Sequence, residues 1–297
     1  MTAAEGLPEQ LEAIVEYLEE AAHVILVDGL PAAADEGDLT VMWARDAAKL
    51  REEFGDNEAQ AWINTTVGMY LAESAHEIVA ISTLLSGGAV TASLSPLLRS
   101  MFERLGVIWW ILDVEVDEME RAWRAALHVL ICWKHYREAA DQLGATKVDL
   151  KTLAEEHREL RVKVQKRFAP EVDPAAPKDS SLWTRKGSGF PDYTDLASAA
   201  MPESIPMRIR RGMYAAQCAM THPNIVALAE TIRLVEAGGL EFFHRSEDIE
   251  KLARAAFATL LGGIKAWSSY FNTEADFDNL VDRLDELATR FDGLFTN

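Results

Sequence analysis

The sequence predicts an all-α protein, a multi-helix bundle with a long proline-rich connection in its middle. Three observations predict this fold class. Apolar side chains recur at helical spacing along most of the 297 residues,. The helical segments are long and the joints between them are short, which is typical of helical bundles. Alternation of apolar and polar residues, the pattern of a half-buried strand, is too brief to predict a sheet.

The sequence pattern in the first half of the chain predicts five helices, and most of them are expected to end at a glycine. They span about 8–27, 40–54, 57–85, 95–113 and 117–143. Thr40 or Asp38 is expected to cap the second helix, and Ser95 before Pro96 is expected to cap the fourth. On the third, a helical wheel places eight residues in one stripe: Ile63, Val67, Tyr70, Leu71, Ser74, Ile78, Ile81 and Leu85,.

The second half begins with a helix that Thr146 or Asp149 starts and that runs to about Phe168,. Residues 169–206 then hold most of the prolines, so we expect an irregular insertion or loop there, with one helical turn near 193–200. Four helices follow, at about 206–222, 223–237, 248–271 and 275–295. A short strand is expected only within 239–244. The whole chain, 1–297, is taken as a single all-helical domain.

Composition limits the class of protein. Hydrophobic residues make up 49% of the chain, enough to bury a sizeable core,. The two cysteines, Cys132 and Cys218, are predicted to be small buried side chains in a reducing compartment. The apolar runs fall far short of the roughly 18 residues that span a bilayer, and the first ten residues lack the basic and apolar parts of a signal peptide. We therefore expect a cytoplasmic protein without a membrane partner.

Charge is distributed unevenly along the chain. With 48 acids against 29 bases the net charge is −19, which disfavours binding to duplex nucleic acid,. Residues 147–211 are the exception, because they hold 13 bases and 10 acids. If the protein binds RNA, we therefore expect the RNA to bind at this basic middle segment.

The first candidate site lies on the predicted helix 206–222. Arg211, Cys218 and His222 share one face, and Tyr214 flanks it,. An arginine, a phenol and a histidine at a helix C-terminus can together hold a phosphate or carboxylate and move a proton. The alternative is that Tyr214 and Cys218 face the core while His222 only caps the helix.

The second candidate site lies on the predicted helix 117–143. One face carries five polar residues: Asp117, Arg121, Arg124, His128 and His135. An arginine followed by a histidine, here Arg121 and His128, resembles the signature of HEPN-type ribonucleases, in which the arginine holds the scissile phosphate and the histidine assists the 2′-hydroxyl. Those proteins usually have a polar residue after the arginine, and Ala122 stands here. The alternative is an ordinary solvated helix face.

Two Glu-x-x-His pairs form the third candidate site. They are Glu73 with His76 and Glu241 with His244. Two such pairs on helices are part of the ligand set of a di-iron carboxylate bundle. Chance placement of the seven histidines explains two matches equally well, and no bound cofactor is predicted.

A family resemblance joins two distant segments. They read GGAVTASLSPLLRSMFERLGVIWWILD, residues 87–113, and YAAQCAMTHPN, residues 214–224. Leu98-Arg99-Ser100 followed by Glu103, and later Tyr214, Cys218 and His222-Pro223, resemble the motifs of an uncharacterised bacterial family of all-helical proteins, a domain of unknown function. That family usually has serine where Cys218 stands.

The resemblance implies a distant relation to HEPN-type bundles and a role in stress response or phage defence. It also implies that Arg99, Glu103 and His222 form one cluster. If the two helices pack together, Glu103 orients His222 and tunes its pKa. The alternative is a buried polar network that only fixes the packing of the helices.

Three functions stay open on the sequence alone, and whether the protein is an enzyme is not decided. The first is a binding or interaction protein, with a homo-oligomer or another protein as partner. The second is a HEPN-like metal-independent ribonuclease that uses Arg211 and His222 or Arg121 and His128. The third is a di-iron carboxylate bundle. No phosphate-binding glycine loop, Cys-x-x-Cys pair or nucleophile elbow is present,.

Overall fold

A computed structural model describes most of the chain between residues 41 and 271. The described residues are 15, 18–19, 22–23, 41–86, 94–169, 171–173, 182–201, 205–221, 232–234, 240–242 and 246–271. The predicted helix 275–295 and His222 lie outside the described residues. The predicted helix 8–27 also lies outside them, except for a few isolated positions. Within these described ranges, no helix has the length and apolar character needed to cross a membrane.

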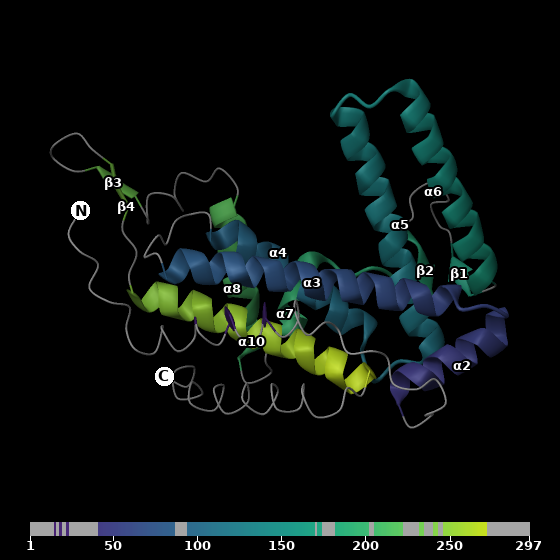
Figure 1. The fold of residues 1–297 in the computed structure, drawn as a ribbon, viewed down its shortest axis with the longest axis horizontal. Helices are drawn as coiled ribbons and strands as arrows, with labels where there is room; N and C mark the ends of the chain where they lie inside the picture. Colours follow the sequence, from purple (N-terminus) through teal and green to yellow (C-terminus); the bar gives the residue numbers. More distant parts are fainter. Residues whose placement is uncertain are drawn as a thin grey trace. The chain divides into compact units, whose positions relative to one another are not determined.

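The all-α prediction is confirmed. The helices are α2 (Met42–Phe54), α3 (Glu58–Ser86), α4 (Leu94–Ile111), α5 (Glu118–Gln142), α6 (Lys147–Phe168), α7 (Tyr193–Ala200), α8 (Met207–Thr221) and α10 (Ser246–Phe271) (Figure 1). Two short antiparallel strand pairs accompany them: β1 (Val172–Asp173) with β2 (Thr184–Arg185), and β3 (Ile232–Leu234) with β4 (Leu240–Phe242).

The chain divides into two compact units, where the sequence pattern had suggested one domain. Unit 1 comprises Met1–Ala34, Gly68–Trp109 and Tyr193–Asn297, and unit 2 comprises Asp35–Val67 and Trp110–Asp192. The division therefore falls within α3 and within α4. Each unit carries one polar cluster that contains predicted site residues, so the two are described separately.

Unit 2 is built from helices whose ends the sequence specifies locally. Gly55 ends α2 with a positive φ of 75°, and the side chain of Asp117 caps α5 by accepting a hydrogen bond from the Glu120 backbone N–H at 2.7 Å,. Thr146 and Asp149 form a capping box at the start of α6,. Figure 1 shows α5 and α6 side by side as an antiparallel hairpin.

Unit 1 is held together by close helix packing. The predicted stripe on α3, which begins in unit 2, is buried along its length except for the half-buried Tyr70. A Cβ placed on Gly106 of α4 would stand 2.6 Å from the Leu196 carbonyl, and one on Gly262 of α10 would stand 2.5 Å from the Ala200 carbonyl oxygen. Two glycines therefore let α4 and α10 approach the backbone of α7.

Several local predictions need correction. The predicted helix 223–237 is wrong at Ile232–Leu234, because this segment pairs as β3 with β4 across a segment containing Gly238 and Gly239. The strand expected within 239–244 is present as β4. Residues 169–206, expected to be irregular, contain β1, β2 and the whole of α7.

Two cap predictions and one burial prediction also fail. Helix α4 begins at Leu94, so Ser95 lies inside the helix and is buried. Val41 occupies the N-cap of α2 and provides no side-chain cap, while Thr40 and Asp38 lie outside the described residues. Cys132 is exposed rather than buried, and Cys218 is half-buried.

Candidate functional site

Three of the predicted site residues meet in unit 1. Glu103 Oε1 accepts a hydrogen bond from Arg99 Nε at 2.8 Å and another from the Tyr214 hydroxyl at 2.6 Å. Arg99 and Glu103 are one turn apart on α4, so their pairing is local. Tyr214 comes from α8, 111 positions further along the chain. The resemblance implied a cluster of Arg99, Glu103 and His222, and the structure instead describes Tyr214 of α8 in contact with Glu103. We call Arg99, Glu103 and Tyr214 the Glu103 network.

The Glu103 network lies between the core and the surface of unit 1. Tyr214 is 4% exposed, whereas the side chains of Arg99 and Glu103 are 27% and 23% exposed. The neighbouring α4 residues Leu98 and Phe102 are fully buried. The phenol is thus fixed within the packed interior, while the ion pair on α4 is partly exposed.

Burial and hydrogen bonding set the protonation states in the Glu103 network. Burial raises the pKa of the Tyr214 phenol well above its usual range, and the hydrogen bond to Glu103 and the nearby Cys218 thiol raise it further,. The hydrogen bond to Glu103 raises the pKa of the Arg99 guanidinium. Tyr214 is therefore a neutral donor and Arg99 a cation at any physiological pH.

Only one oxygen of Glu103 is used by these contacts. Both described hydrogen bonds reach Oε1, and no described residue donates to Oε2. Two donors from two helices hold the carboxylate in place, while its second oxygen stays available as an acceptor. The arrangement presents a fixed anionic acceptor beside a guanidinium cation.

The remaining candidates on α8 are placed differently. Arg211 is exposed and forms an ion pair with Asp195 of α7, with 2.5 Å between Nη2 and Oδ1. Its neighbour Arg210 is buried and donates from Nη1 to the carbonyl oxygens of Ser198 and Met201, at 2.9 and 3.0 Å. Arg210 thereby satisfies carbonyl groups at the end of α7. The approach of Glu103 to His222 stays a prediction.

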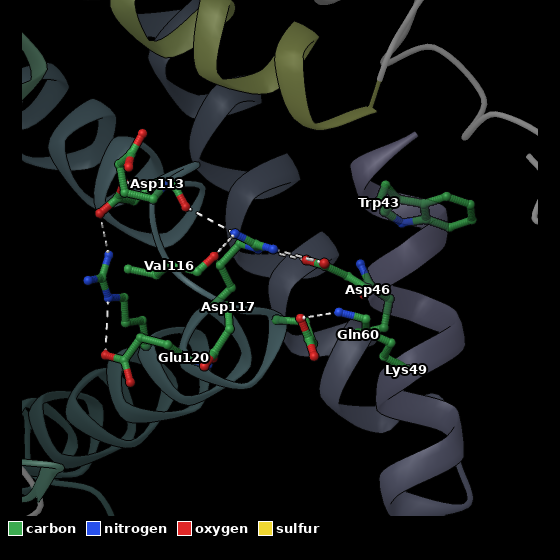
Figure 2. A network of polar contacts seen from close by, with 12 residues as sticks. Trp43, Asp46, Lys49, Gln60, Asp113, Val116, Asp117 and Glu120 are labelled. Atoms are coloured by element: carbon green, nitrogen blue, oxygen red, sulfur yellow. Dashed lines mark hydrogen bonds and ion pairs between the residues drawn. The ribbon is translucent and has the colours of Figure 1, made fainter. Parts of the chain in front are cut away.

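The polar cluster of unit 2 is centred on Arg121. Its Nε and Nη2 donate to the two carboxylate oxygens of Asp46 at 2.7 and 2.9 Å, and both side chains are almost completely buried. Its Nη1 donates to the carbonyl oxygens of Asp113, at 3.1 Å, and of Val116. Figure 2 shows Asp46 on α2 facing the start of α5, near which Asp113, Val116 and Asp117 gather.

Two further arginines extend this cluster. Arg124 donates to the Trp110 carbonyl oxygen at 2.5 Å and lies 3.2 Å from Asp113 Oδ2. Arg185, which precedes a turn in the proline-rich segment, lies 2.8 Å from Glu120 Oε2. Each buried guanidinium is paired with a carboxylate, as burial of a charge requires. The cluster ties α2, α5 and β2 together.

His128 is buried beside this cluster and stays neutral. Its ring stacks on Phe190, with 5.4 Å between centroids, and its Nε2 lies 3.4 Å from Cys132 Sγ. Burial, together with the charge of His135, lowers the pKa of His128 to about 4,. A neutral imidazole of such low basicity is a poor general base at neutral pH.

The alternative of a solvated face on α5 is therefore wrong for three of the five residues that carry it. Arg121, Arg124 and His128 are buried, and only His135 is exposed on this face beyond the N-cap. The reason is that this side of α5 contacts Asp46 of α2, Asp113 of the segment after α4 and Phe190 of the proline-rich segment. Since its donors are taken by Asp46 and two carbonyl groups, Arg121 is not available to hold a scissile phosphate.

The residues proposed for a metal site are not gathered in one place. Glu73 and His76 are both exposed on α3, Glu241 lies in strand β4 rather than on a helix, and His244 is outside the described residues. In the described part of the chain, no three or more histidine, cysteine, aspartate or glutamate side chains cluster as metal ligands.

Unit 2 also contains a pocket of about 430 Å³, which is lined by Glu53, Phe54, Lys163, Lys166 and Arg167. Asp56 Oδ1 and Oδ2 accept hydrogen bonds from Arg167 at 2.8 and 2.7 Å, and Glu58 pairs with both Arg167 and Lys163. The hydrogen bond from Arg167 lowers the pKa of Asp56 to about 2. The pocket thus adjoins ion pairs in which Asp56 and Glu58 neutralise Arg167 and Lys163. The pocket therefore attracts an anion only weakly.

Sequence reasoning missed Asp46, Arg185 and Arg210 as members of these clusters. Asp46 and Arg121 are 75 positions apart, and no local sequence motif predicts that they pair. An aspartate on the apolar face of a predicted helix was the one available signal, because a buried carboxylate requires a cation. No protein-family model, curated protein or solved structure matches the chain, so its function must be argued from its own residues.

Proposed function

We propose that the protein is a binding protein, and that the Glu103 network is the place where its ligand or partner is recognised. One observation carries the proposal: Glu103 is held by donors from α4 and α8 through Oε1 alone, while its side chain keeps 23% of its exposure. A carboxylate held in advance loses little conformational entropy when it binds.

The chemistry of the network defines the group that it can bind. Glu103 Oε2 accepts an N–H or O–H group, and the Arg99 cation balances the charge of the carboxylate. A neutral donor such as an amide, an exocyclic amine or a hydroxyl therefore fits better than a bare anion, which Glu103 would repel. A peptide or a nucleoside carries such donors.

A thermal-shift panel tests this proposal. The purified chain is heated alone and with adenosine, cytidine, N-acetyl-glycinamide or L-arginine, each at millimolar concentration. A ligand at 100 times its Kd stabilises the folded state by about 2.7 kcal/mol, which raises Tm by several degrees. We expect at least one probe to raise Tm of the wild type, and expect Glu103→Gln to abolish that rise.

Glu77→Gln is the matched control. Glu77 of α3 pairs with Arg104 in the same unit, so this variant also removes an ion-paired carboxylate, but one outside the Glu103 network. It should keep the probe-dependent rise. If no probe shifts the wild type, or if Glu103→Gln retains the shift, the network serves only the packing of α4 on α8.

The ribonuclease alternative now depends on α8, because Arg121 is saturated and His128 is buried and neutral. Incubating the protein with RNA in the presence of a chelator tests it. Cleavage that is lost in His222→Ala and retained in His128→Gln would replace the binding proposal with that alternative.

A further inference from the structure

One face of α6 carries bases and no acids. At 100° per residue, four basic residues fall within an arc of about 80°. They are Lys147, Lys151, Arg158 and Arg161, which we call the basic stripe. Ala154 and Gln165 complete this face. The acids of the helix lie outside the arc: Asp149, Glu155, Glu156 and Glu159.

Three of the four residues of the basic stripe are exposed and at most weakly neutralised. Lys147, Lys151 and Arg158 are exposed, and Arg161 is half-buried. Lys151 lies 3.9 Å from Glu155, but side-chain exposures of 77% and 51% make this pair weak,. Among the described residues, Lys147 and Arg158 have no carboxylate partner. This contrasts with Arg121, Arg124, Arg167 and Arg185 of the same unit, which are all paired with carboxylates.

A buried histidine reports the positive potential along this part of the hairpin. His157 packs under the stripe, with Nδ1 3.4 Å from Arg137 Nη1 of α5. Burial, together with the charges of Arg161, Arg137 and Lys134, lowers the pKa of His157 to about 4,. Cations from both helices therefore contribute to the field.

The geometry of the basic stripe fits an extended chain of phosphates. From Lys147 to Arg161 the helix rises about 21 Å, which is the length of several nucleotides of a single strand. We propose that the basic stripe of α6 docks the phosphate backbone of a single-stranded nucleic acid. This inference concerns unit 2 and does not depend on the Glu103 network.

Other anionic partners fit the surface less well. Binding in a bilayer surface requires a broad apolar face beside the bases, and the large exposed apolar side chains of α6 are only Val148 and Val162,. A duplex carries twice the phosphate density and would bring more of it near the acidic surface of a chain with net charge −19,. A single strand can follow the stripe alone.

Fluorescence anisotropy with a labelled 15-nucleotide RNA of mixed sequence tests the proposal. If four phosphates are neutralised, the slope of log Kobs against log salt is about −2.8, so binding weakens about 50-fold between 50 and 200 mM NaCl. Lys147→Gln with Arg158→Gln should weaken binding at 50 mM and halve the slope. A second double variant, Lys147→Gln with Lys151→Gln, should also weaken binding and halve the slope. It keeps the test valid if the first double variant does not fold.

Lys163→Gln with Lys166→Gln is the matched control, because both lysines are exposed on α6 but lie outside the arc. This control should change Kd less than two-fold. Equal weakening by the control pair would show bulk electrostatics instead of a docking surface. Absence of binding at 50 mM, or tighter binding to duplex DNA, anionic vesicles or polyglutamate than to the RNA, would also overturn the proposal.

Discussion

At the scale of single residues, the buried pair of Asp46 and Arg121 joins α2 to α5 within unit 2. Asp46→Ala would remove the carboxylate that pairs with Arg121, and carbonyl groups would remain among the partners of the buried guanidinium. We expect a loss of about 3–5 kcal/mol in the free energy of unfolding, measured by urea denaturation.

Lys49→Ala is the control for this prediction. Lys49 belongs to the same helix and pairs with Glu118 at 3.0 Å, but its side chain is 59% exposed. Its removal should cost less than about 1 kcal/mol. If Asp46→Ala costs no more than Lys49→Ala, the buried pair contributes nothing to the stability of unit 2.

His128 makes the stability of the fold depend on pH. Its pKa falls from 6.5 in the unfolded chain to about 4 in the folded one, so below pH 6.5 the unfolded state binds a proton that the folded state does not,. The stabilisation is complete above pH 6.5 and is lost as pH falls toward 4. From pH 7.5 to 5, His128 accounts for a loss of about 2 kcal/mol.

Urea denaturation of the wild type and of His128→Gln at pH 7.5 and at pH 5 measures the loss of unfolding free energy that His128 causes. The variant should lose about 2 kcal/mol less than the wild type over that interval. Identical losses for the two proteins would mean that His128 is protonated as readily in the folded state as in the unfolded one.

At the scale of elements, the short helix α7 is positioned by glycines on its neighbours. Gly106→Ala would drive a Cβ into the Leu196 carbonyl at 2.6 Å, so we expect a loss of about 1–3 kcal/mol or more,. Gly212→Ala on α8 meets nothing within 4 Å and should stabilise the protein by about 0.5–1 kcal/mol,. Thermal denaturation of the two variants should therefore shift Tm in opposite directions, and a Gly106→Ala protein as stable as the wild type would contradict the close approach.

Helix ends were predictable where the signal is local. Gly55 and the caps at Asp117 and Thr146 act within one turn of their own positions, so the sequence shows them. The strand Ile232–Leu234 was not predictable, because three apolar-rich residues suit a helix or a strand, and pairing with Leu240–Phe242 decides between them,. Ser95 similarly resembled a cap, yet packing continues the helix one residue earlier.

At the scale of the whole molecule, the sequence predicted one long-range cluster, that of Arg99 and Glu103 with His222, and it did so through a family resemblance. His222 lies outside the described residues, so this cluster stays a prediction, and the residue of α8 that Glu103 contacts in the structure is Tyr214. The partners of Arg121 and Arg124 come from α2 and from the segment after α4, and no spacing rule connects them. Periodicity indicates that a face is buried without indicating what covers it.

The structure also separates the basic residues of the acidic chain into two groups. Arg121, Arg124 and Arg185 are buried and neutralised by carboxylates, so they add stability to unit 2 and no attraction for anions. Three of the four bases of the stripe on α6, Lys147, Lys151 and Arg158, are exposed instead. The basic middle segment is therefore a narrow stripe on one helix and not a broad positive surface.

The central claim is that Glu103 is a recognition group, and titration calorimetry tests it most directly. The probe that shifts Tm most in the thermal panel is titrated into the wild type, Glu103→Gln and Glu77→Gln. We predict that Glu103→Gln weakens binding at least about ten-fold, or about 1.4 kcal/mol, and that Glu77→Gln changes Kd less than two-fold. Equal affinity of the wild type and Glu103→Gln would contradict the claim.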